Sequence, residues 1–158
     1  MSYDTNPFPD DPDRSAIWDM LVHRDIDAYL AGNWDAVQDD FIAEGFIGIN
    51  GNGAGNADRW TLGFAQLEDY RAGWLGGVVD PADFAEDLRT AIFRATSLDH
   101  IDINGDMALA HKKFDGSVER VDGTQMVLKW QSLYYLRRIG GRWKIFGFTG
   151  YLPNPMKD

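Results

Sequence analysis

Three turn signals in the second half of the chain restrict its fold most strongly. The dipeptides Asn104-Gly105, Asp122-Gly123 and Gly140-Gly141 favour tight turns between antiparallel strands. They separate runs rich in β-branched and aromatic residues, and we predict four strands at about residues 91–103, 107–115, 125–138 and 142–151. This half of the chain therefore predicts an antiparallel sheet.

The first half has helical rather than strand periodicity. Asp11-Pro12 predicts a capped helix start, and apolar residues follow on one stripe until Gly32. Asn33 predicts the cap of a second helix at about 34–43. Further elements are expected as a strand at 46–49 and helices at about 65–75 and 80–88. We predict an α+β domain, in which N-terminal helices pack on a curved, mostly antiparallel sheet around an internal pocket.

The length of 158 residues fits one domain with its own core, and no linker divides the chain. We predict a flexible N-terminal arm at residues 1–11, a single domain at 12–152 and a C-terminal tail at 153–158.

Charge and composition narrow the possible partners. The 25 acidic and 15 basic residues give a net charge of -10, which disfavours nucleic acid and anionic membrane surfaces. The absence of cysteine excludes disulfides, thiolate metal sites and cysteine nucleophiles. No apolar run approaches the ~20 residues that a membrane span needs, and no secretion signal opens the sequence, so we expect a cytoplasmic location.

Three segments resemble the nuclear transport factor 2-like superfamily, which includes ketosteroid isomerases, scytalone dehydratase and SnoaL-type polyketide cyclases. They are Tyr29-Leu-Ala-Gly-Asn-Trp-Asp-Ala-Val continuing to Phe41, Ile101-Asp-Ile-Asn-Gly-Asp-Met-Ala-Leu-Ala, and Tyr135-Leu-Arg-Arg-Ile-Gly-Gly-Arg-Trp-Lys-Ile. The resemblance implies a cone-shaped half-barrel with an internal pocket. It leaves function open, because the superfamily holds enzymes, binding modules and structural subunits.

The functional residues of ketosteroid isomerase are not kept. Its first-helix tyrosine falls near Asp25, its proton-abstracting aspartate on Ile49 or Asn50, and its second oxyanion acid near Leu133 or Tyr134. We therefore do not predict that chemistry.

The turns also predict which side chains share a face of the sheet. If each turn has two residues, Tyr134 lies opposite His111, and Ser132 lies one step along the same face. The large apolar residues of the last two strands share this face, so we predict that it is concave and lines the pocket. A β-bulge near Asp115-Gly116 would instead turn the alanines of strand 107–115 inward, with Asp99 among them.

Three residues are candidates for catalysis. The resemblance to scytalone dehydratase implies that a first-helix acid and a strand histidine work as a pair, here Asp25 and His111. The carboxylate would raise the pKa of the imidazole, which could then act as a general acid or base near neutral pH. The Tyr134 hydroxyl could donate to a developing oxyanion.

Two other motifs predict no cofactor and no metal. The glycine-rich stretch 48–55 has Asn56 where a dinucleotide fingerprint needs its last glycine. The three histidines, His23, His100 and His111, have no metal-ligand spacing.

Three function classes remain open. The leading prediction is a protein that binds a small apolar or aromatic molecule. Its ligand-binding residues would be Tyr29, Trp34, Trp60, Trp74, Trp130 and Ser132. The alternatives are a cofactor-free lyase or isomerase, which would use the three catalytic candidates, and a structural subunit.

We also predict a homodimer through the convex face of the sheet. Under the assumed register this face carries an apolar patch, made of Leu133, Tyr135, Phe146 and Phe148.

Overall fold

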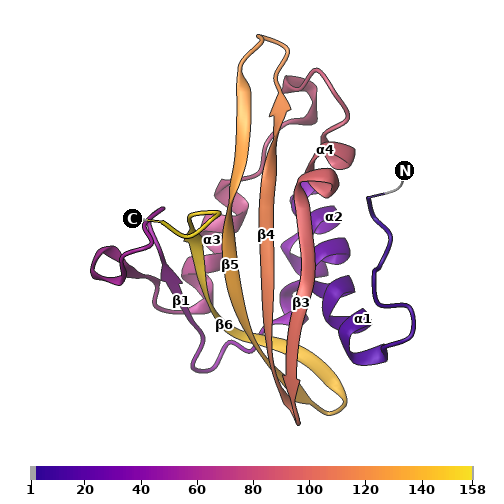
Figure 1. Ribbon diagram of the computed structural model, residues 1–158, viewed down its shortest axis with the longest axis vertical. Coiled ribbons are helices and arrows are strands. Elements are labelled where there is room, and N and C mark those ends of the chain that lie inside the picture. Colours follow the sequence, from indigo (N-terminus) through magenta and orange to yellow (C-terminus); the bar gives the residue numbers. More distant parts are fainter. Residues whose placement is uncertain (1–2, 158) are drawn as a thin grey trace.

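The computed structural model describes residues 3–157, so residues 1–2 of the predicted arm and residue 158 of the predicted tail lie outside the described residues. Six strands form one sheet in the order β2-β1-β6-β5-β4-β3 (Figure 1). Neighbouring strands are antiparallel, except that β1 and β6 run parallel. The strands are β1 Ile47–Asn50, β2 Thr61–Phe64, β3 Thr96–Asn104, β4 Met107–Glu119, β5 Gln125–Ile139 and β6 Arg142–Leu152.

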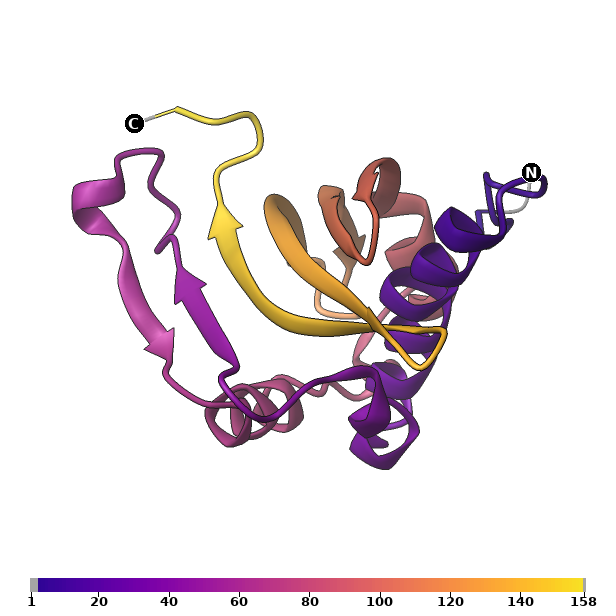
Figure 2. The ribbon, with the colours of Figure 1, turned by 90° about the horizontal axis from the view of Figure 1, so that it is seen from below.

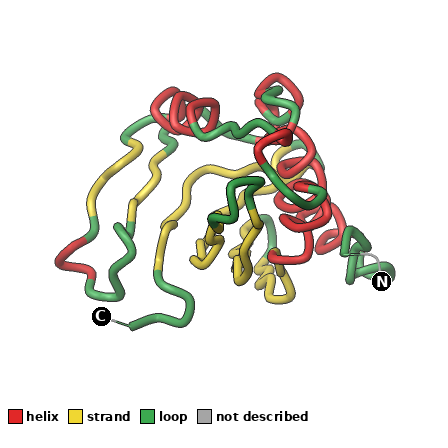
Figure 3. The backbone as a smooth tube through the Cα atoms, turned by 90° about the horizontal axis from the view of Figure 1, so that it is seen from above, coloured by secondary structure: helices red, strands yellow, loops and turns green. Residues whose placement is uncertain are grey.

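The helices are α1 Pro12–Trp18, α2 Asp25–Leu30, α3 Leu67–Gly76 and α4 Leu88–Ala95. Views along the strands show them on one side of the sheet, which leaves the other face of β3, β4 and β5 without a helix (Figures 2 and 3). We call these the helix-covered face and the outer face. The predicted α+β architecture is confirmed, and the sheet does not close into a barrel.

The first helix begins and ends as predicted. The Asp11 carboxylate accepts from the backbone N–H of Arg14 at 3.1 Å, and Gly32 ends the helix with φ +63°. Between α1 and α2 the helix widens into a π-helical segment, Asp19–Arg24, which the sequence pattern did not predict. Such segments are frequent at functional sites, because they redirect backbone carbonyls and side chains.

Three predicted elements differ from the structure, and the first is the helix expected at 80–88, where only a 3₁₀ turn forms at Pro81–Asp83. The helix expected at 34–43 is a pair of 3₁₀ turns, Trp34–Ala36 and Gln38–Asp40. Here Asp40 turns inward and accepts hydrogen bonds from Arg24 at 2.8 Å and Arg142 at 2.7 Å. The strand expected from residue 91 begins at Thr96, because Asp87 caps α4 by accepting from the Thr90 N–H at 2.9 Å.

An aromatic cluster forms the centre of the core. The rings of Trp34 and Phe41 stack with centroids 5.2 Å apart, and those of Tyr70 and Phe148 meet edge to face at 5.0 Å. The cluster joins the 3₁₀ turns, α3 and β6 through Trp34, Phe41, Phe46, Tyr70, Trp74 and Phe148.

The register of β4 against β5 differs from the predicted one by a single residue. The connecting loop has three residues rather than two, since the Arg120 N–H donates to the Thr124 carbonyl at 2.8 Å and Gly123 takes a φ of +86°. Tyr134 therefore lies opposite Ala110, and His111 opposite Leu133. The alternative with inward alanines is the correct one, although its cause is this loop and not a bulge near Asp115.

A second irregularity changes the predicted dimer patch. Leu136 pairs with Ile145 as predicted, but the register then shifts, and Tyr135 lies opposite Gly147 instead of Phe146. Phe148 consequently points to the helix-covered face, where it is 2% exposed. The prediction that Phe148 belongs to an outer patch is wrong.

Among residues 3–157, no helix is both long and apolar enough to cross a membrane. The predicted cytoplasmic location stays a prediction.

Candidate functional site

A buried lysine lies on the helix-covered face of β4. Alternation along the strand turns Ala108, Ala110 and Lys112 inward, and the Lys112 side chain is 1% exposed. Its Nζ donates to the Leu21 carbonyl in the π-helical segment at 2.5 Å and to Asp25 Oδ2 at 3.0 Å. A buried ammonium needs such partners, because desolvation is costly. Lys112 thus links the sheet to the first helix.

Asp25, at the start of α2, is the partner of this lysine. Its Oδ1 accepts from Trp74 Nε1 of α3 at 3.3 Å, while Oδ2 accepts from Lys112. The Asp25 side chain is 28% exposed. A carboxylate offers about four acceptor positions, so about two remain open to another donor.

Two tyrosines lie beside Asp25 in the interior. Asp25, Tyr70 and Tyr134 line the same hollow, whose volume of about 10 Å³ is room for about one water molecule. Burial raises the pKa of Tyr134 and of Tyr70 well above the usual value, and the Asp25 charge raises both further. Both phenols therefore stay protonated and able to donate. The hollow is much smaller than the predicted small-molecule pocket.

Two more tyrosines extend the group. The Tyr29 hydroxyl, one turn after Asp25 on α2, donates to the Gly77 carbonyl. Burial raises the pKa of Tyr29 and of Tyr151, and the Asp25 charge is the next cause in both. The charge of Asp25 therefore acts on tyrosines of four different elements: Tyr29 of α2, Tyr70 of α3, Tyr134 of β5 and Tyr151 of β6.

Four partly exposed rings of the sheet form what we call the aromatic wall: Phe64, Phe114, Trp130 and Tyr151. The Phe114 and Trp130 centroids are 4.4 Å apart, and Tyr151 lies 6.2 Å from Trp130 and 6.3 Å from Phe64. Lys112 Nζ lies 5.1 Å from the Phe114 centroid, so the wall meets the buried pair. The aromatic wall therefore adjoins the buried pair and remains partly open to solvent.

The structure brings together two of the three predicted catalytic residues. Asp25 and Tyr134 share the hollow on the helix-covered face. His111 lies on the outer face, where its Nε2 contacts Gln131 Oε1 at 2.5 Å. The prediction that His111 shares a cavity with Tyr134 and pairs with Asp25 is therefore wrong, and the cause is the three-residue loop.

The predicted ligand-binding residues do not share one pocket. Trp74 and Tyr29 lie next to Asp25, with ring centroids 5.5 Å apart, and Trp130 belongs to the aromatic wall. Ser132 is buried on the same face, and Trp34 is packed inside the core. Trp60 lies apart from them, since its Nε1 donates to the Ala54 carbonyl at 2.8 Å in the β1–β2 connection.

Sequence reasoning missed Lys112, Tyr70 and Tyr151. A signal for Lys112 was present, because it continues the inward alternation of Ala108 and Ala110 that the alternative register required. Tyr151 gave no such signal, because it bends β6 with a φ of +57°.

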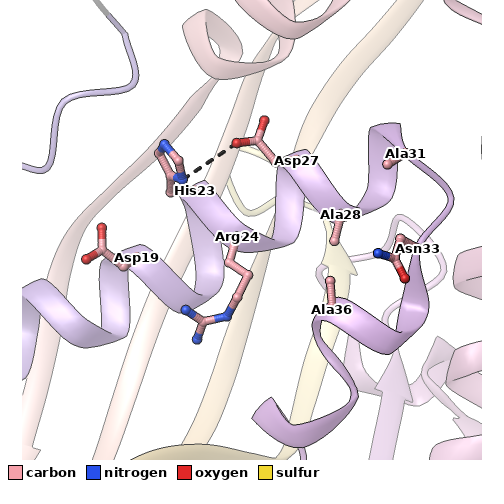
Figure 4. A pocket seen from close by; sticks show the side chains of 8 residues that line it. All are labelled: Asp19, His23, Arg24, Asp27, Ala28, Ala31, Asn33 and Ala36. Carbon is pink, nitrogen blue, oxygen red and sulfur yellow. Dashed lines mark ion pairs between the residues drawn. The ribbon is translucent and has the colours of Figure 1, made fainter.

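A larger hollow on the far side of the first helix is a weaker candidate (Figure 4). Its volume is about 640 Å³, but its charged side chains already pair with other protein groups. Asp27 Oδ1 accepts a hydrogen bond from Arg89 Nε at 2.7 Å, and Asp27 Oδ2 lies 3.6 Å from His23 Nδ1. Arg24 forms an ion pair with Asp40. Within residues 3–157, no group of three or more acidic, histidine or cysteine side chains is arranged to hold a metal ion.

Comparison with known proteins identifies the fold. No family model and no curated protein matches the chain. Solved structures do match. An NTF2-like protein of unknown function from Silicibacter pomeroyi aligns with a TM-score of 0.57 at 15% identity, over 88% of this chain and 94% of that one. One from Pseudomonas putida aligns at 0.55 and 18% identity, over 86% and 83%.

A ketosteroid isomerase-like protein from Erwinia carotovora atroseptica aligns with a TM-score of 0.52 at 13% identity, over 88% of this chain and 94% of that one. The class of protein is thus an α+β domain with helices on one face of a bent sheet. More specifically, the chain has the nuclear transport factor 2-like fold, which confirms the resemblance predicted from sequence.

Proposed function

We propose that the chain binds a small organic molecule whose polar group contacts Asp25. The observation that carries this proposal is the pair formed by Asp25 and Lys112, in which the lysine is buried and the carboxylate is partly open. An apolar or aromatic body of the ligand would lie against the aromatic wall.

The energetics of a buried ion pair support this proposal. The attraction between two buried charges roughly offsets their desolvation, so such a pair contributes little to folding compared with apolar residues of similar size. A role in binding explains its presence better than stability does. The Trp74 Nε1–H donates to Asp25 and would hold the carboxylate in place for a ligand.

Size decides where the ligand would lie. The interior hollow of about 10 Å³ admits no organic molecule. The ligand would therefore approach the partly exposed Asp25 carboxylate from solvent, and its body would extend toward the aromatic wall.

A thermal-shift screen with aromatic alcohols, ketones and amines tests this proposal. A ligand present at about 100 times its dissociation constant adds about 2.7 kcal/mol to the free energy of unfolding. Any hit should lose most of its shift in Asp25→Asn and keep it in His111→Ala, the matched variant on the outer face. Hits that respond equally to both variants would place binding elsewhere.

A second candidate function is a cofactor-free isomerase or lyase. It is favoured by one observation, the shared hollow of Asp25 and Tyr134. Only the carbonyl oxygen of a substrate would enter this hollow, where Tyr134 would donate a hydrogen bond to the oxyanion that forms. The Asp25 carboxylate would accept a proton from the neighbouring substrate carbon and return the same proton to another carbon of the substrate. With a substrate in hand, Asp25→Asn should abolish turnover, and His111→Ala should retain it.

We also propose a homodimer through the outer face. Partly exposed apolar side chains lie there, among them Leu109, Leu133, Tyr135 and Phe146. No helix covers this face of β3, β4 and β5 (Figure 3). Sedimentation should give twice the chain mass of 17.8 kDa, and Tyr135→Glu should halve it. Val121→Glu, in the β4–β5 loop, is the matched control. A mass of one chain at micromolar concentration rejects the dimer.

A further inference from the structure

The two charges of the buried pair are not equally accessible. The Asp25 side chain is 28% exposed, whereas that of Lys112 is 1% exposed behind it. A molecule that reaches this site from solvent meets the carboxylate first. The open acceptor positions of Asp25 therefore decide which polar group the site accepts.

Distance favours a positive group over a negative one. A ligand nitrogen in contact with Asp25 would lie roughly 3 Å from the carboxylate and roughly 6 Å from the ammonium behind it. Because the Coulomb energy falls with distance, the attraction to Asp25 is then roughly twice the repulsion by Lys112. An anion in the same place would face the opposite balance.

The rings around Asp25 add to this preference. Tyr29 and Trp74 meet edge to face beside the carboxylate, and Tyr151 stands at the edge of the aromatic wall. Aromatic faces attract cations, whether ammonium or guanidinium. The chain already uses this interaction, since the Lys112 ammonium lies 5.1 Å from the Phe114 centroid.

The raised pKa values of the tyrosines indicate the sign of the electrostatic potential around them. After burial, the charge of Asp25 is a cause of the raised pKa of Tyr29, Tyr134 and Tyr151, and it contributes at Tyr70. The potential that Asp25 creates at these four phenols is therefore negative, which agrees with the distances above.

From this geometry we infer that the site takes an organic cation, an ammonium group carried on an apolar or aromatic body. The ammonium contacts the open edge of Asp25 among Tyr29, Trp74 and Tyr151, and the body lies on the aromatic wall. This inference rests on the proposed function, since it specifies the ligand class of the same site.

Three probes of nearly equal shape test the inference by calorimetry on the whole protein at pH 7. They are 2-naphthylmethylammonium, 2-naphthylmethanol and 2-naphthoate, which differ in charge. We expect the ammonium to bind about 10-fold more tightly than the alcohol, with the carboxylate weakest. Asp25→Asn should remove the preference, and Asp19→Asn, an exposed acid on the same helix, should keep it.

The inference is overturned if the alcohol or the carboxylate binds as tightly as the ammonium, a ranking that needs no variant. It is also overturned if the preference for the ammonium survives in Asp25→Asn. Failure of all three probes to bind would instead count against the proposed function itself.

Discussion

The two faces of β4 and β5 have opposite characters, although their residues alternate along the same strands. On the helix-covered face, Lys112 and Tyr134 are enclosed by helices and aromatic rings. On the outer face, His111 and Lys113 meet solvent and polar neighbours. Residues adjacent in sequence thus differ completely in surroundings. A register error of one residue exchanges the two environments, and with them the candidate site.

The largest expected effect tests the enclosed face. Asp25→Ala leaves the Lys112 ammonium buried without its counter-ion, with the Leu21 carbonyl and the Phe114 ring as its remaining partners. We therefore expect a loss of about 3 kcal/mol in the free energy of unfolding. Urea denaturation measures it. A loss below about 1 kcal/mol would mean that the Lys112 ammonium is hydrated in the variant and is not enclosed.

The second-largest expected effect is a loss of protein stability at alkaline pH, caused by the tyrosines of the helix-covered face. The pKa values of Tyr70 and Tyr134 are raised in the folded state above the usual 10.0. Their contribution to the free energy of unfolding is therefore complete below pH 10 and falls as the pH rises further. The loss is about 1 kcal/mol for each tyrosine at pH 11. Denaturation between pH 8 and 11 should show this decline, and a Tyr70→Phe and Tyr134→Phe double variant should flatten it.

Lys112→Met should cost less than Asp25→Ala. The partly exposed Asp25 carboxylate can recover hydration, and methionine fills the space of the lysine stem, so we expect a loss of about 1 kcal/mol. The same denaturation series provides the measurement. A larger cost for Lys112→Met than for Asp25→Ala would reverse our view of which charge is enclosed.

A substitution on the outer face should change the free energy of unfolding least. His111→Ala removes a partly exposed ring whose polar contact is with Gln131, and we expect a change within about 0.5 kcal/mol. An effect of several kcal/mol would show that His111 is enclosed, as the two-residue turn assumed.

The sequence allowed the fold to be predicted further than the site. Helix ends at Asp11 and Gly32 and the two-residue turn at Gly140-Gly141 follow from local chemistry, which acts within a few residues. The side-chain directions in β4 depend on whether the Asp122-Gly123 loop holds two or three residues, and both lengths suit this dipeptide. The choice is made by the packing of Ala110 and Lys112 against the helices, which no local pattern contains.

The inward direction of Asp25 follows from the helical stripe alone. Its partner was not predicted, because Lys112 depends on the sheet register and on the π-helical segment that presents the Leu21 carbonyl. Long-range pairing therefore limits what the sequence reveals about this site.

Amine labelling of the adjacent residues Lys112 and Lys113 tests whether Lys112 is enclosed on the helix-covered face of β4 while Lys113 is exposed on the outer face. Reductive methylation of the folded protein, read by tandem mass spectrometry, compares two lysines with the same chemistry on opposite faces. We predict that Lys113 is labelled readily, and that Lys112 is protected until the protein is denatured, since its side chain is 1% exposed. Labelling of Lys112 in the folded state at the rate of Lys113, or protection of Lys113 instead, would contradict this prediction.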